Sequence, residues 1–192
     1  MDDIAKEEYK QIFTMTSQLE QRMLQIFGLS LAVSVSIFSA IAVKIVMGSN
    51  ESDLKILDIY LLLAPMLISI PAFSLLLAHR LDLARAAAYQ KVFYESKSDY
   101  AGWVTRLNEY RKHSQSEGHD PMPLAYWSVS LLSSGMFLFF MISLSFSIAH
   151  LVVGIIPLLI MAKLQYSWSS VVKQEREKCV AIWEKVKQEH NK

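Results

Sequence analysis

The chain has 192 residues, of which 53% are hydrophobic and 19% are charged, with a net charge of +1. A soluble domain usually carries about 25% charged residues, so the composition disfavours an ordinary soluble domain. Its single cysteine, Cys179, excludes an internal disulfide framework and a cysteine-based metal cluster.

Charged residues are absent from three long apolar segments. The first lies between Arg22 and Lys44, the second between Asp58 and Arg80, and the third runs from 121 to 162. A helix needs about 20 residues to cross the hydrocarbon core of a bilayer. The first two segments therefore fit one span each, and the third fits two.

These lengths predict an all-α, multi-pass membrane protein with four transmembrane helices arranged as two hairpins. We expect the tight turn of the second hairpin near 147–150. The predicted spans are about 24–46, 57–79, 124–146 and 149–168.

The basic residues predict the orientation of the chain. All of the 19 Lys and Arg residues except Lys44 and Lys55 lie on one side of the predicted spans. Because cytoplasmic segments are enriched in Lys and Arg, both termini and the central segment should be cytoplasmic, in an inner membrane. No cleavable signal is expected at the N-terminus. The cytoplasmic parts would be 1–23, 80–123 and 169–192. Aromatic residues should mark the inner interface: Tyr126, Trp127, Tyr166 and Trp168.

The cytoplasmic parts also show helical patterns. The second span should continue beyond Arg80, since the following residues are good helix formers. The N-terminal segment is amphipathic, and Cys179 and Trp183 share one apolar face of the tail. We expect these three helices to pack together below the membrane, with docking on lipid as the alternative. Helical spacing also marks three candidate partner-binding residues: Trp103, Leu107 and Tyr110.

Small residues recur every four positions along the first span, at Gly28, Ala32, Ser36 and Ala40. In lipid, such a small-residue stripe lets helix backbones approach closely. We therefore expect these residues to pack against protein. A contact with another span of the same chain is favoured, and a contact between subunits is the alternative.

Three prolines lie inside predicted spans, at Pro65, Pro71 and Pro157. Proline removes a helical hydrogen bond and can kink the helix. We interpret these kinks as features of shape, with a gating hinge as the sharper alternative.

The predicted spans contain serines but no mid-membrane charge. Ser130, Ser133 and Ser134 supply hydroxyl groups in the third span, although serines can satisfy their own helix carbonyls. The absence of Asp, Glu, Lys and Arg at mid-membrane argues against a proton-coupled transporter or a highly selective ion channel.

The sequence contains no strong catalytic motif. Arg106 and His113 have a spacing similar to the Arg-x4-6-His motif of HEPN ribonucleases, and Glu117 with His119 could suggest a metal site. A solvated, charged loop is the favoured interpretation of both. The chain has no P-loop, GxSxG or HExxH motif. We therefore expect no catalytic residue, no cofactor, no metal and no direct binding of nucleic acid.

The segments RLDLARAAAYQKVFYES and GWVTRLNEYR, set between two predicted hairpins, resemble small bacterial four-span membrane proteins of antiphage defence systems. The membrane subunit of the Kiwa system is one such protein, and SLATT-type pore effectors are similar in architecture. The resemblance covers the topology of the whole chain and transfers no functional residue. It implies a non-enzymatic, homo-oligomeric inner-membrane component that recruits a cytosolic protein. A pore-forming effector that depolarises the cell is the alternative.

Overall fold

The computed structural model describes residues 3–47, 56–94, 121–143 and 148–190. Within these ranges the chain is helical and contains no strand. Four helices are long and apolar enough to cross a membrane, namely Glu7–Lys44, Leu57–Phe93, Met122–Ser143 and Ile148–Glu189. The prediction of an all-α protein with four such helices is confirmed.

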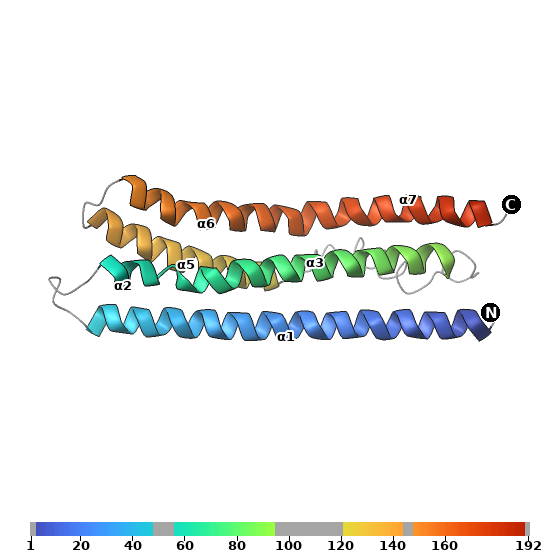
Figure 1. Cartoon of the computed structure of the whole chain (residues 1–192), viewed down its shortest axis with the longest axis horizontal. Coiled ribbons are helices and arrows are strands. Elements are labelled where there is room, and N and C mark those ends of the chain that lie inside the picture. The colour runs from blue at the N-terminus through green and yellow to red at the C-terminus, as the bar shows by residue number, and fades with distance from the viewer. Residues whose placement is uncertain (1–2, 48–55, 95–120, 144–147, 191–192) are drawn as a thin grey trace. The chain divides into compact units, whose positions relative to one another are not determined.

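These helices are built from several elements in chain order, which Figure 1 labels except for a short π-helix. They are α1 (Asp3–Met47), α2 (Ile56–Leu61), α3 (Ala64–Phe93), α5 (Pro121–Ser143), α6 (Ile148–Tyr166), the π-helix η3 (Ser167–Val171) and α7 (Val172–His190). α6 begins at Ile148, so His150 lies in its first turn and not in the predicted interhelical turn.

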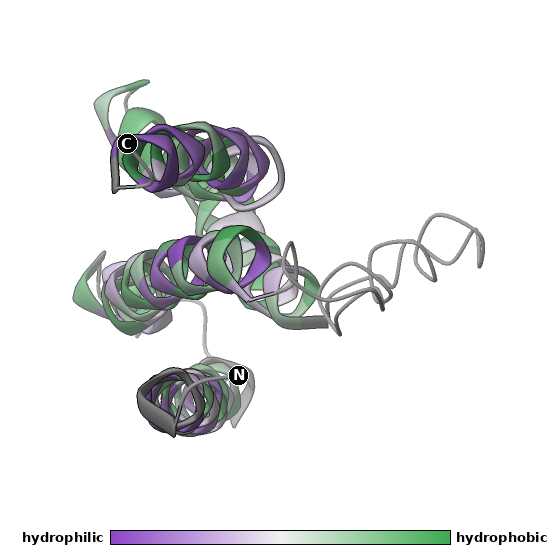
Figure 2. Cartoon of the chain, turned by 90° about the vertical axis from the view of Figure 1, so that its right-hand side faces the viewer, coloured by the Kyte–Doolittle hydropathy of each residue, from purple (hydrophilic) through white to green (hydrophobic). Residues whose placement is uncertain are grey.

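The chain divides into two compact units, which are described separately. The apolar unit comprises 25–76 and 121–166, and the polar unit comprises 1–24, 77–120 and 167–192. α1 and α3 contribute residues to both units. Figure 2 shows α7 of the polar unit, which ends at the label C, mainly in the purple of hydrophilic residues.

One face of α5 forms much of the core of the apolar unit. Tyr126, Ser130, Ser134, Phe137 and Met141 are fully buried. Their spacing of three or four residues places them on one side of a helix. The large exposed side chains of α5 are apolar, as a lipid-facing surface requires: Leu124, Leu131, Leu132, Phe139 and Ile142.

Pro65 coincides with a break in the second span. Proline has no N–H, and its ring clashes with the carbonyl of the residue four positions earlier. Accordingly, α2 ends at Leu61, and a turn over Leu62 and Leu63 precedes α3. In this turn the N–H of Leu62 donates to the carbonyl of Ile59 at 3.1 Å, and that of Leu63 donates to the carbonyl of residue 60 at 3.0 Å. By contrast, α3 and α6 continue through Pro71 and Pro157.

Two of the aromatic residues predicted at the inner interface are buried within the protein. Tyr126 is fully buried in the apolar unit, and Trp168 is buried in the polar unit, whereas Tyr166 is 66% exposed. The reason is local chemistry, because Tyr126 bonds a serine hydroxyl and Trp168 lies beneath a guanidinium group.

Candidate functional site

The apolar unit contains a buried polar layer. Six serines from three helices are buried, and interfaces between membrane helices are enriched in such small polar residues. We call this set the serine layer: Ser30 and Ser34 from α1, Ser69 from α3, and Ser130, Ser133 and Ser134 from α5.

Hydroxyl groups connect α1, α3 and α5 within this layer. Ser34 Oγ donates to the Pro65 carbonyl at 3.3 Å and lies 3.0 Å from Ser69 Oγ. Because a hydroxyl has one proton, Ser69 donates to Ser34 whenever Ser34 donates to Pro65. Ser134 Oγ donates to the Met66 sulfur at 3.1 Å. These contacts join the three helices just after the break in the second span.

Tyr126 and Ser30 form the next polar contact. The Tyr126 hydroxyl is hydrogen-bonded to Ser30 Oγ, which also donates toward the Ile26 carbonyl at 2.6 Å. The Tyr126 ring stacks on Phe73 with centroids 5.3 Å apart and meets the edge of Phe27 at 5.7 Å. The aromatic contacts hold the phenol in place, so its hydroxyl is directed at α1.

Two members of the serine layer have no hydrogen-bond partner among the described residues. These are Ser130 Oγ and Ser133 Oγ, which are fully buried. Ser130 lies one helical turn from both Tyr126 and Ser134, which face α1 and α3 respectively. A buried hydroxyl without a partner costs about 1–3 kcal/mol. Both hydroxyls therefore retain unused hydrogen-bonding capacity inside the apolar unit.

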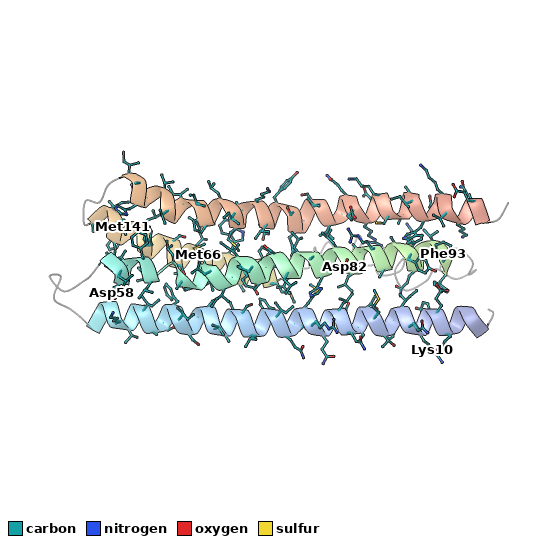
Figure 3. The ribbon with its side chains drawn as sticks, in the orientation of Figure 1. Lys10, Asp58, Met66, Asp82, Phe93 and Met141 are labelled. Atoms are coloured by element: carbon teal, nitrogen blue, oxygen red, sulfur yellow. The ribbon has the colours of Figure 1, made fainter. Side chains whose placement is uncertain are left out.

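An apolar plug adjoins the serine layer along α5. We use this name for Ile59, Leu62, Phe137 and Met141, which are all fully buried and pack together. Phe137 follows the last serine of the layer by three residues, which is about one helical turn. Figure 3 labels Met141 of the plug and Met66, whose sulfur accepts a hydrogen bond from Ser134 of the adjoining layer. The polar and apolar groups thus occupy successive levels of the same helix face.

α6 comes close to this plug because Gly154 has no side chain. A Cβ atom at Gly154 would lie 2.7 Å from Phe137 Cδ1 and 2.9 Å from Leu138 Cδ2, which is too close for an ordinary contact. Glycine therefore allows α6 to support the Phe137 ring directly.

Two polar contacts hold α2 at the other side of the plug. Asp58 forms an ion pair with Lys44 at the end of α1 (Figure 3). The Tyr60 hydroxyl is hydrogen-bonded to His150 Nδ1 in α6, and the Tyr60 ring meets the edge of Phe137 at 5.3 Å. α2 is therefore tethered to α1 and α6 while it contributes a side chain to the plug.

In the polar unit, aromatic residues join α1, α3 and α7. Tyr89 of α3 donates its hydroxyl to Glu8 of α1, and its ring meets the edge of Trp183 of α7 at 5.0 Å. The Lys187 ammonium donates to the Val92 carbonyl at 2.9 Å. The three helices thus pack together in this unit.

Arginines of α3 make a second set of contacts in the polar unit. The Arg80 guanidinium lies 4.3 Å above the Trp168 ring, a cation–π geometry. Arg85 forms ion pairs with Asp82 and with Glu175 of α7. Beyond the arginines, Tyr94 directly follows α3. Burial and the neighbouring Glu8 carboxylate of α1 raise the pKa of Tyr94.

The small-residue stripe lies elsewhere than expected. Gly28, Ala32, Ser36 and Ala40 are all exposed in the single chain, which corrects the prediction that they contact another span of it. The contact is made from the other side of α1, because Ser30 and Ser34 hydrogen-bond to groups of α5 and α3. A contact of the stripe with a second subunit stays a prediction.

The remaining sequence candidates lie outside the described residues. These are the possible partner-binding residues Trp103, Leu107 and Tyr110 and the ribonuclease-like pair Arg106 and His113. Within the described ranges, no group of three or more His, Cys, Asp and Glu residues is placed to hold a metal ion.

Half of the serine layer was predicted from the sequence, namely Ser130, Ser133 and Ser134. The other half, Ser30, Ser34 and Ser69, was missed, as was the hydrogen bond of Tyr126 to Ser30. The spacing of four residues between Ser30 and Ser34 places both on one face of α1. This spacing was the sequence signal from which both serines could have been predicted.

Comparison with protein-family models, curated proteins and solved structures found no match for this chain.

Proposed function

We propose that this protein is a non-enzymatic inner-membrane component of a bacterial antiphage defence system, in which it acts as an oligomeric sensor or scaffold. Its termini and central segment face the cytoplasm, where the polar unit recruits a soluble protein that performs the chemistry. The resemblance to four-span defence proteins supplies the biological setting of this proposal.

The observation that supports it best is the construction of the polar unit. α1 and α3 each run from the apolar unit into the polar unit without a break between the two. Contacts of Tyr89 with Glu8 and Trp183 then join them to α7. Such a unit offers a partner a helical surface that is covalently attached to the spans. Side chains exposed on α7 include Lys178, Ile182 and Lys185.

Exposure of the small-residue stripe supports an oligomer. Small residues contribute little contact with lipid, whereas they allow a second helix to approach closely. A second copy of the chain packed on Gly28, Ala32 and Ser36 would use this surface.

The test is affinity purification of the tagged protein in mild detergent, followed by native mass spectrometry. We expect a homo-oligomer that carries a defined soluble protein in fixed stoichiometry. Trp103→Ala or Tyr110→Ala should weaken capture of that protein, while Leu131→Ala, on the exposed side of α5, should leave capture unchanged. A homo-oligomer without any stoichiometric soluble partner would refute the scaffold proposal.

A pore-forming effector is the second candidate, and the serine layer favours it. Buried hydroxyls without protein partners, set beside an apolar plug, are the elements from which a weakly selective, closed water path can be built. The absence of charged residues from the serine layer and the plug fits poor ion selectivity. Depolarisation of cells upon induction or infection is the expected result, and an intact membrane potential in dying cells would exclude this function.

A further inference from the structure

We propose that α2 and the turn Leu62–Leu63 form a gate that closes a path for water and small hydrated ions through the apolar unit. The serine layer is the hydrated part of this path, and the apolar plug is its barrier. The inference rests on the second candidate function, since it gives the pore its lining and its closing element.

The serine layer supplies the lining. Ser130 and Ser133 present hydroxyls that no group in the described part of the chain satisfies, and Ser34 and Ser69 lie within the same layer. In lipid no solvent from outside can satisfy these groups, so each carries the energetic cost of an unmade hydrogen bond. Water is a small molecule that both donates and accepts hydrogen bonds, and it matches hydroxyl groups in this respect.

The apolar plug supplies the barrier. Ile59, Leu62, Phe137 and Met141 offer water no hydrogen bond and are fully buried. Narrow apolar constrictions block ions by dewetting, without any charged group. Because Phe137 follows the serine layer on the same face of α5, the barrier lies in line with the lining.

The break at Pro65 gives the barrier a movable wall. Ile59 belongs to α2 and Leu62 to the turn that follows, whereas Phe137 and Met141 belong to the unbroken helix α5. Hinges commonly lie at the ends of elements, where a few residues absorb the change in backbone angles. Rotation at Leu62–Leu63 would separate the two halves of the plug while α3 keeps its contacts with α1.

Two polar contacts hold α2 in the closed position. The Lys44–Asp58 ion pair and the Tyr60–His150 hydrogen bond tie α2 to α1 and α6. Since the Tyr60 ring also packs against Phe137, release of this tyrosine would remove a side chain that supports the plug. The closed state is thus held from both sides of α2.

The experiment is K⁺ efflux from liposomes that contain the purified full chain. Leu62→Ser and Phe137→Ser should each raise efflux about tenfold or more, the change expected when a barrier falls by about 1.4 kcal/mol. Leu131→Ser and Leu132→Ser are matched controls, because they introduce the same residue on the exposed side of α5. These controls should remain as tight as the unmodified protein.

A suppressor tests the route of the leak. Adding Ser130→Val to the Leu62→Ser protein should return efflux toward the unmodified level, because it removes an unpartnered hydroxyl from the lining. Release of entrapped carboxyfluorescein reports general damage to the bilayer or misfolding. It should not increase in any variant.

The outcomes separate the gate from the pore function. If both plug variants are as tight as the controls, or if the controls leak equally, the gate proposal is overturned. If the unmodified protein already leaks at the rate of the variants, the plug is no barrier, although a pore function survives. If the plug variants leak selectively but the unmodified protein never depolarises cells, the gate geometry is supported and the effector function fails.

Discussion

Ser30→Ala should destabilise the apolar unit more than Tyr126→Phe does, although both changes remove the same hydrogen bond. Ser30 Oγ keeps an alternative acceptor, the Ile26 carbonyl at 2.6 Å. The Tyr126 hydroxyl is fully buried and has Ser30 as its hydrogen-bond partner. The two deletions therefore leave different groups unsatisfied.

The magnitudes follow from this difference. Ser30→Ala leaves a buried phenol without a partner, which should cost about 1–3 kcal/mol. Tyr126→Phe leaves a serine that still bonds its own helix, so the loss should be close to the average of about 0.6 kcal/mol for hydrogen bonds between membrane helices. The ring contacts with Phe73 and Phe27 remain in both variants. The double variant should cost no more than Ser30→Ala alone, because neither partner is then left unsatisfied.

The assay is unfolding in mixed micelles with increasing SDS, followed by circular dichroism. Ser128→Ala is the matched control, because Ser128 also bonds a carbonyl of its own helix, at 3.0 Å, but is exposed. We expect the control to change the free energy of unfolding little. The reasoning would be refuted if Tyr126→Phe lowered the free energy of unfolding as much as Ser30→Ala does. It would also be refuted if the control lowered it as much as either variant.

Two further predictions concern glycine packing and pH. Gly154→Ala should cost about 1–3 kcal/mol because a Cβ would press on the Phe137 ring. Gly135→Ala should be tolerated because nothing lies within 4 Å of a Cβ at that position. SDS unfolding of both proteins measures the contrast, and equal losses would contradict it. Burial and the neighbouring Glu8 carboxylate raise the pKa of Tyr94 above 10.0, so its contribution to stability should be complete below pH 10 and should be lost as the pH rises through the raised value. Thermal unfolding of the unmodified protein and of Tyr94→Phe between pH 8 and about 12 tests the sign, and a steeper loss in the variant would show that the tyrosine is not responsible.

Sequence reasoning located the helices well and their contacts poorly. The uncharged segments predicted four spans because a charge in hydrocarbon is costly, and four helices that could cross a membrane are present. Pro65 was a candidate kink, and its effect on the helix follows from the missing N–H. The missing N–H predicts a kink equally at Pro71, yet α3 continues through that residue. The sequence therefore did not show which proline breaks the helix.

The serine layer shows why the candidate site was only partly predicted. Ser134 was visible as a hydroxyl in an apolar segment, but a serine can equally bond its own helix carbonyl, as Ser128 does on the same helix. The two arrangements have the same local sequence pattern. Which of them occurs depends on whether another helix brings a partner, as α3 does with Met66.

The sequence by itself determined which segments are apolar helices, because length and charge decide whether a segment can leave water. It also placed the small-residue stripe on one face of α1, since a spacing of four residues has a fixed direction on a helix. Tertiary structure alone decided that this face is exposed and that the serine face is buried. The physical reason is that lipid and a leucine-rich core are equally apolar. Hydrophobicity therefore does not distinguish the two sides of a spanning helix, and hydrogen bonds and close packing between helices decide which side turns inward.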